Sequence, residues 1–228
     1  MGLGVALSCI GLVACGGGER QDEDEPEGSF PVSIVKAEFP NRQRLAQTSE
    51  LVLSVRNEGN ETIPDLAVTV NTRRQDEQGS GEAGAQPTPS ANGSFSVLSE
   101  QEGLAIPSRP VWILEQNYPK LAGETASAGA EAAQTNTYSF GVLDSGDTRE
   151  IVWKLTAVQS GRYVVDYRIA AGLQGKAIAE NTDGSEPEGQ FVVVISDVPP
   201  QTRVDESGKV VPIEPSDIVG QAGSKQQK

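Results

Sequence analysis

The residue types that usually carry out catalysis are scarce in this chain. It has 228 residues and no histidine, which removes serine–histidine and cysteine–histidine nucleophiles and histidine-ligated zinc, copper and haem. Its 32 aspartates and glutamates offer many carboxylate pairs of the kind that glycosidases use, but none stands among glycines and aromatic residues as in a substrate cleft. Walker, Rossmann and CxxC motifs are also missing. The sequence therefore predicts no catalytic residue, no cofactor and no enzyme activity.

One loop carries oxygen-bearing side chains at alternating positions. Residues 181–186 read Asn-Thr-Asp-Gly-Ser-Glu, a spacing faintly like that of a calcium loop. The segment lacks the bidentate glutamate that follows in register in such loops. A polar hairpin turn accounts better for the same residues, so we expect no metal here.

Both cysteines lie in or beside an apolar run at the N-terminus. Residues 3–14 are too few to cross a bilayer, which takes about 20 residues, but suit the apolar core of a signal peptide. The run ends in Leu12-Val13-Ala14-Cys15, followed by three glycines, and this resembles the lipobox of bacterial lipoproteins. No Lys or Arg precedes the run, which departs from that pattern. The alternative is a short buried apolar segment with two incidental cysteines.

The lipobox resemblance implies a processing event and a location. Residues 1–14, with Cys9, would be removed as a signal peptide, and Cys15 would carry lipid at the outer face of the cell membrane. The mature chain would then hold no pair of thiols and no disulfide. Residues 15–29 are mostly acidic and polar, so we expect an extended tether between the anchor and the folded domain.

The charge of the chain restricts its partners. Lys and Arg number 18 against 32 Asp and Glu, for a net charge of −14. Such a field repels phosphate backbones and anionic lipid surfaces. Nucleic acid is therefore excluded as a partner, and membrane contact is expected only through the lipid anchor.

Apolar and polar residues alternate with period two through most of the chain, as in strands with one face exposed to water. Leu51, Leu53 and Val55 share one face of such a segment, and Ile151 and Trp153 share one face of another. No convincing amphipathic helix occurs. Turn residues recur about every ten positions, which favours an all-β, immunoglobulin-like antiparallel sandwich over residues 30–197. The expected strands are residues 31–39, 50–57, 63–70, 138–143, 148–156, 163–171, 176–179 and 190–195.

Two further segments break the alternation. Residues 72–135 form a long insertion, whose first part, 72–93, is rich in Gln, Asp, Glu, Gly, Ser and Pro and is expected to be disordered and dispensable. The tail 198–228 is polar with several prolines, and disorder is expected there too.

Two patterns resemble immunoglobulin-like modules of the CARDB and NEW3 kind. The segment 55–68 (Val-Arg-Asn-Glu-Gly-Asn-Glu-Thr-Ile-Pro-Asp-Leu-Ala-Val) resembles their hairpin with a Val-x-Asn-x-Gly turn. The segment 143–163, with Leu143-Asp144-Ser145-Gly146 and Gly161-Arg162-Tyr163, resembles their second half. The chain as a whole also resembles actinobacterial lipoproteins of the envelope. These resemblances imply the sandwich fold and no known chemistry.

Several residues have structural roles in this interpretation. Gly59 and Gly146 are expected at tight turns that need a positive φ. Tyr163 is a candidate tyrosine corner, whose hydroxyl caps a loop backbone. Trp153 should be a core residue, because it alternates with Ile151 and other apolar residues.

Trp112 and Tyr118 are the candidate partner contacts. Both lie in the insertion, near a segment bounded by prolines. Trp112 is either a core residue on an added edge strand or an exposed anchor for a protein or glycan. The sequence thus predicts a membrane-anchored, non-enzymatic interaction module of the cell envelope, with a carbohydrate-binding or enzyme-accessory domain as the alternative.

Overall fold

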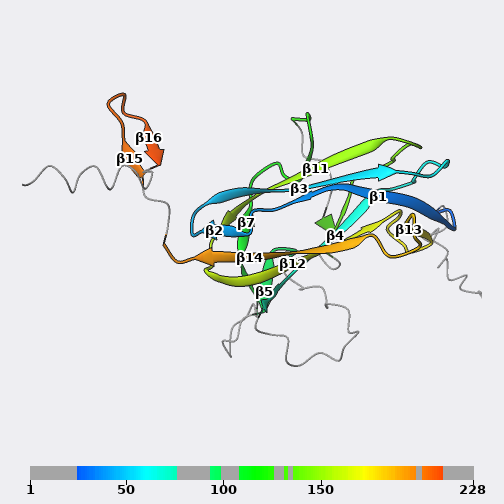
Figure 1. Cartoon of the computed structure of the whole chain (residues 1–228), viewed down its shortest axis with the longest axis horizontal. Helices are drawn as coiled ribbons and strands as arrows, with labels where there is room; N and C mark the ends of the chain where they lie inside the picture. The colour runs from blue at the N-terminus through cyan, green and yellow to red at the C-terminus, as the bar shows by residue number, and fades with distance from the viewer. Residues whose placement is uncertain are drawn as a thin grey trace, which may run out of the picture.

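The computed structural model describes residues 25–75, 93–98, 108–125, 131–132, 136–198 and 202–212. Every secondary-structure element in these parts is a strand (Figure 1). None of the described residues forms a helix that is long and apolar enough to cross a membrane. The predicted signal peptide, Cys15 and the predicted tether up to residue 24 lie outside the described residues.

Two sheets pack face to face (Figure 1). The first sheet has the order β13-β1-β3-β11-β7, with β8 also paired to β11. Its strands are β13 (Ala177–Asn181), β1 (Gly28–Glu38), β3 (Thr48–Asn57), β11 (Thr148–Ala157), β7 (Trp112–Leu114) and β8 (Lys120–Leu121).

The second sheet has the order β2-β14-β12-β4-β10-β9. Its strands are β2 (Arg42–Arg44), β14 (Glu188–Ser196), β12 (Gly161–Ala170), β4 (Ala67–Arg74), β10 (Thr137–Ser139) and β9 (Glu131–Ala132). Two small hairpins pair β5 (Ser96–Leu98) with β6 (Ser108–Pro110), and β15 (Thr202–Val204) with β16 (Val210–Pro212).

The strand order is that of an immunoglobulin-like sandwich, which confirms the predicted fold class. The neighbours β1, β3 and β11 correspond to strands A, B and E, and β4, β12 and β14 to strands C, F and G. The expectation of purely antiparallel sheets is wrong at the edges. There β13 joins β1, and β2 joins β14, in parallel register.

The predicted hairpin over residues 55–68 is also wrong. Its two arms belong to β3 and β4, which lie in different sheets, so the turn at 58–66 carries the chain across the core. Alternation specifies only which side chains are buried, and it is the same for a hairpin and for a crossing between sheets.

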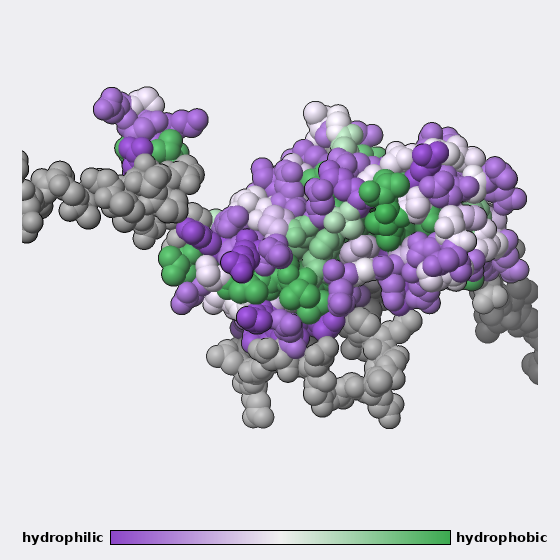
Figure 2. Space-filling view, in the orientation of Figure 1, coloured by the Kyte–Doolittle hydropathy of each residue, from purple (hydrophilic) through white to green (hydrophobic). Residues whose placement is uncertain are grey.

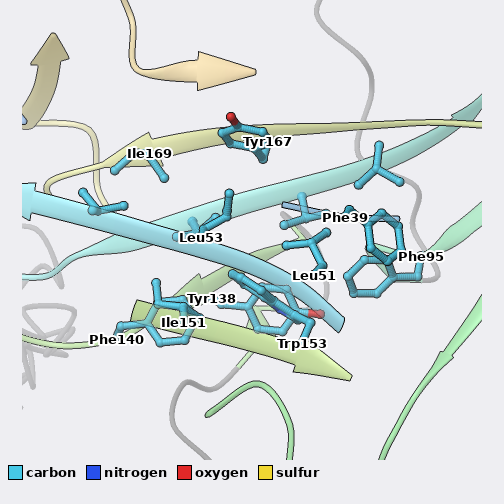
Figure 3. Close-up of a cluster of buried hydrophobic side chains, with 14 of the residues drawn as sticks. Phe39, Leu51, Leu53, Phe95, Tyr138, Phe140, Ile151, Trp153, Tyr167 and Ile169 are labelled. Atoms are coloured by element: carbon cyan, nitrogen blue, oxygen red, sulfur yellow. The ribbon is translucent and has the colours of Figure 1, made fainter. Parts of the chain in front are cut away.

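The inward faces of the two sheets form one apolar core (Figure 3). On β3 and β11 the predicted inward residues Leu51, Leu53, Ile151 and Trp153 are all fully buried. The Trp153 indole lies edge-on to Tyr138, with ring centroids 5.7 Å apart. The prediction of Trp153 as a core residue is therefore confirmed.

The insertion contributes to this core, contrary to its description as a polar addition. Thr72 is buried within β4, and Phe95 and Val111 are buried as well. Strands β7, β8 and β9 extend the two sheets. Each of these apolar segments is only a few residues long, so the overall polar composition of residues 72–135 does not indicate them. Residues 76–92 lie outside the described part of the chain.

The tail contains a hairpin that the sequence interpretation missed. Strands β15 and β16 meet at a turn in which the Asp205 carboxylate accepts hydrogen bonds from the Ser207 hydroxyl and from the backbone of Ser207 and Lys209. These bonds hold the pKa of Asp205 below its usual value. Residues 213–228 of the predicted disordered tail lie outside the described residues.

The two turn glycines differ. Gly146 has a φ of +77°, as predicted, and a side chain there would be strained. The φ of Gly59 does not lie in this positive range. Its requirement is space, because a Cβ at Gly59 would lie 3.1 Å from Pro31 Cδ.

We expect Trp153→Ala to lower the free energy of unfolding by about 3–5 kcal/mol, because it removes a fully buried indole and leaves a cavity. Urea unfolding of the Trp153→Ala and Lys154→Ala variants measures this, since Lys154 is the partly exposed neighbour on the same strand. Equal losses in the two variants would contradict the assigned faces of β11.

Candidate functional site

The strands place different loops at the two ends of the sandwich. One end carries the loops after β3, before β11 and between β12 and β14. The other end carries the loop from β1 to β3, the turn from β11 to β12, and the end of β14. These two ends also differ in charge.

The first end, which we call the acidic end, is rich in exposed carboxylates. Its three loops present six of them on exposed residues: Glu58, Glu61, Asp144, Asp147, Asp183 and Glu186. Two large apolar residues are also exposed in these loops, Val142 at 52% and Leu173 at 49%. This end therefore combines negative charge with accessible apolar surface.

Asn57 joins two loops of the acidic end. Its side chain is fully buried, and its amide group donates to the carbonyl oxygens of Glu61 (2.8 Å) and Leu143 (3.1 Å). Its Oδ1 accepts a hydrogen bond from the Gly59 amide at 2.9 Å. The backbone of Asn57 also pairs with Gly146 and Asp147. Glu61 and Asp147 thus lie on two loops that the hydrogen bonds of Asn57 link to each other.

The candidate calcium segment is a closed polar turn. The Asp183 carboxylate accepts hydrogen bonds from the Ser185 hydroxyl and amide, at 2.6 and 3.0 Å. These bonds hold the pKa of Asp183 below its usual value. The side chain of Asn181 donates to Ser185 Oγ and to the Glu186 carbonyl. These hydrogen bonds within the turn account for its polar groups, as expected for the polar hairpin turn that the sequence favours here.

The other end carries an unexpected cluster of arginines on the outer face of the second sheet. The register places Arg42, Val194 and Arg162 side by side on β2, β14 and β12. Arg44 lies two residues further along β2, and Val192 two residues back along β14. We call these five residues the arginine patch. Figure 2 shows hydrophobic and strongly hydrophilic surface interleaved where β2 and β14 lie.

Strand geometry gives the spacing of the patch. Neighbouring strands lie about 4.8 Å apart, so the Cα atoms of Arg42 and Arg162 are separated by about 10 Å, with Val194 between them. Arg42 and Arg44 are about 7 Å apart along their strand. All three arginines are exposed, as are Val192 at 43% and Val194 at 36%. The patch is a flat surface with three positive charges around two valines.

Within the described part of the chain the arginines of the patch have no ion-pair partner, whereas others on the same face are neutralised. Arg73 is 2.9 Å from Asp166, and Arg168 is within ion-pair distance of Glu186 and Glu188. Arg42, Arg44 and Arg162 form no ion pair with any residue that the structure describes. Positive charge therefore accumulates locally, although the chain as a whole has a charge of −14.

The strand that carries two of these arginines is fixed from inside the core. Gln43, between Arg42 and Arg44, is buried at 3% exposure. Its Oε1 accepts a hydrogen bond of 2.7 Å from the Trp112 indole, and its Nε2 donates to the Pro40 carbonyl at 3.0 Å. With the Gln43 side chain held inward, its two neighbours must point outward.

Of the two alternatives for Trp112, the structure supports the core residue and not the exposed anchor. Its side chain is only 2% exposed, and its ring lies 5.5 Å from that of Phe39 and 5.7 Å from that of Tyr163. Its position on the edge strand β7 puts it over the core because β7 pairs with β11. Through its bond to Gln43, Trp112 supports the arginine patch from within the core.

Tyr163 has the predicted tyrosine-corner geometry. Its hydroxyl donates to the Ser160 carbonyl at 2.9 Å, at the start of β12, which is strand F of the immunoglobulin scheme. Burial raises the pKa of this hydroxyl, so it stays protonated as a donor. The bond fixes the turn that leads directly into Arg162.

Tyr118 lies on the opposite side, at the edge of the first sheet. It is half-buried between β7 and β8, next to the cis-proline Pro119. The Lys120 ammonium lies 4.8 Å from the centre of its ring. No described contact joins it to the arginine patch, and its contact with a partner stays a prediction.

Comparison with known proteins gives a likeness of fold. No family and no curated protein matches this sequence. Among solved structures, a CARDB domain of Pyrococcus furiosus in complex with di-metal ions has a TM-score of 0.39 at 9% identity, and covers 79% of this chain and 100% of its own. Alpha-2-macroglobulin of Escherichia coli has a TM-score of 0.37 at 13% identity, over 76% of this chain but only 7% of its own. The fold and the site define an immunoglobulin-like domain with one basic and one acidic surface.

Asn57→Ala should lower the free energy of unfolding by about 2–3 kcal/mol, since two carbonyls and an amide lose buried hydrogen-bond partners. The control Asn60→Ala changes an exposed residue of the same turn and should be nearly neutral. Thermal unfolding of both variants provides the measurement, and a neutral Asn57→Ala would refute its role in joining the loops.

Trp112→Phe should lower the free energy of unfolding by about 1–3 kcal/mol beyond the loss expected from the smaller side chain, because Gln43 Oε1 would be buried without a donor. The double variant Trp112→Phe/Gln43→Leu removes both polar groups and should recover part of that loss. A double-mutant cycle by urea unfolding tests the bond, and strict additivity of the two changes would argue against it.

Proposed function

We propose that this chain is a lipid-anchored, extracytoplasmic binding module without enzyme activity, and that it recognises an acidic partner through the arginine patch. The observation that carries this proposal is the clustering of Arg42, Arg44 and Arg162 without an ion-pair partner among the residues that the structure describes. Positive charges held close together repel one another, so the cluster contributes nothing to the stability of the sheet. A partner that carries carboxylates relieves this repulsion.

The chemistry of the patch suits carboxylates on an extended or flat surface. Guanidinium groups bind carboxylates with two parallel hydrogen bonds. The spacing of about 7 Å between Arg42 and Arg44 equals that of alternate side chains in an extended peptide. Val192 and Val194 add apolar contact area between the charges. The backbone N–H and carbonyl of Arg44 are already hydrogen-bonded to Gln47. A partner strand therefore cannot pair with the backbone of β2 at Arg44, and recognition there depends on side chains.

The anchor follows from the lipobox resemblance at Cys15 and fits the position of the first described residues. Glu25 accepts a hydrogen bond of 3.0 Å from the Gln174 amide, so the chain joins the domain at the acidic end. The residues from Cys15 to Glu25 can span about 33 Å when extended. The arginine patch, at the opposite end, would then face away from the tether attachment. The carbohydrate-binding alternative lacks an exposed tryptophan, since Trp112 and Trp153 are both buried.

The recognition is tested with poly-L-glutamate as the probe and the chain from Gly16, which keeps every described strand. Retention should be strong at low salt, and Arg42→Ala/Arg44→Ala/Arg162→Ala should weaken it at least about tenfold, the loss expected for removed charge-assisted bonds. The matched control Arg56→Ala/Lys120→Ala/Lys154→Ala removes three positive charges elsewhere. Equal weakening in both triple variants would show a general charge effect and overturn the assignment of the patch.

The anchor is tested separately in cells. Cys15→Ser should abolish lipid attachment and shift the protein from the membrane fraction to an unprocessed or soluble form, because stable anchoring requires acyl chains. Mass spectrometry of the membrane fraction gives the attached lipid. A Cys15→Ser protein of mature mass that still sediments entirely with membranes would contradict the lipoprotein proposal.

A further inference from the structure

We propose that the acidic partner is a second copy of this chain, and that copies associate head to tail, with the arginine patch of one copy against the acidic end of the next. This inference rests on the arginine patch of the proposed function. A second copy is the expected partner because two surfaces at opposite ends of the same domain are complementary.

The two surfaces match in charge. The arginine patch carries three positive groups that no described residue pairs. The acidic end carries exposed carboxylates, among them Glu61 and Asp147, which form no side-chain hydrogen bond or ion pair with any described residue. Opposite charges on two rigid surfaces give attraction that steers approach and fixes orientation.

They also match in their apolar parts. Val192 and Val194 lie among the arginines, and Val142 and Leu173 lie among the acidic loops, each at least 36% exposed. An interface whose centre is apolar and whose rim is charged is the usual arrangement in protein complexes. Apolar residues on both surfaces distinguish a protein partner from a small anion, which would need the charges alone.

Both surfaces are held rigid from within, so association demands little ordering. Gln43 and its bond to Trp112 fix β2, and Asn57 joins the two loops that carry Glu61 and Asp147. Preorganised surfaces lose less conformational entropy on binding.

The geometry determines the kind of assembly. The surfaces are different and lie at opposite ends, so each copy has one donor and one acceptor surface. Such heterologous contacts generate chains or rings in place of a closed two-fold dimer. Screening by salt should disrupt them, because the Debye length falls from about 10 Å at 0.1 M to about 3 Å at 1 M ionic strength.

Sedimentation velocity of the chain from Gly16 provides the test. The unmodified chain should show a sedimentation coefficient that rises with protein concentration at about 0.1 M NaCl, and this rise should vanish at about 1 M NaCl. Arg42→Glu/Arg44→Glu/Arg162→Glu and Glu61→Lys/Asp147→Lys should each stay monomeric alone. Their mixture should associate again, since each reversed surface then meets a complementary one. Circular dichroism spectra confirm that both variants are folded.

The control Arg56→Glu/Lys120→Glu/Lys154→Glu, with the same change in net charge, should associate like the unmodified chain. A chain that stays monomeric at every salt and protein concentration would overturn the inference, as would two variants that fail to associate when mixed. Retention on poly-L-glutamate that depends on the arginine patch, in a chain that never self-associates, would refute self-recognition and leave the proposed function standing.

Discussion

The hydrogen bond between Trp112 and Gln43 ties together parts of the molecule that are distant in the sequence. Trp112 comes from an edge strand of one sheet, and Gln43 from an edge strand of the other. A glutamine in an apolar core is tolerated only when its polar atoms are bonded, so the Trp112 indole stabilises the inward position of Gln43 and with it the place of β2 beside β14. The contact contributes to the closure of that end of the sandwich, to the outward direction of Arg42 and Arg44, and to the attachment of the insertion to the core.

The arrangement separates a supporting interior from two oppositely charged surfaces. Side chains alternate along every strand, so the residues that fix the core and those that are exposed at the surface occupy neighbouring positions, as Gln43 and Arg44 do. The connections between the sheets then bring loops from separate parts of the sequence to one end. Negative charge gathers there, and positive charge remains on the outer face of the second sheet. An acidic chain thereby acquires a basic surface without any basic segment in its sequence.

Much of the scaffold follows from the sequence, because alternation reports burial directly. The inward faces of β3 and β11, the core position of Trp153, the corner at Tyr163 and the turn at Gly146 were predictable residue by residue. The arginine patch was not, since Arg42 and Arg162 are 120 positions apart and meet only through the pairing of β2 and β12 with β14. The pairing of distant strands carries no local signal. For the same reason the sequence predicts a hairpin where β3 and β4 in fact lie in different sheets, and it leaves Trp112 open between a core position and a partner contact.

The positions of β1 and β14 determine how the domain responds to mechanical load. The first strand begins at one end of the sandwich, and β14 finishes at the other, so tension applied between these two points runs along the strands. Hydrogen bonds in antiparallel ladders are perpendicular to the strand direction, and a force along the strands therefore loads all the bonds of a ladder in shear at the same time. The ladder resists such a pull far better than one opened from its end, bond by bond. Tension along the length of this domain therefore loads whole ladders together and does not open them one hydrogen bond at a time.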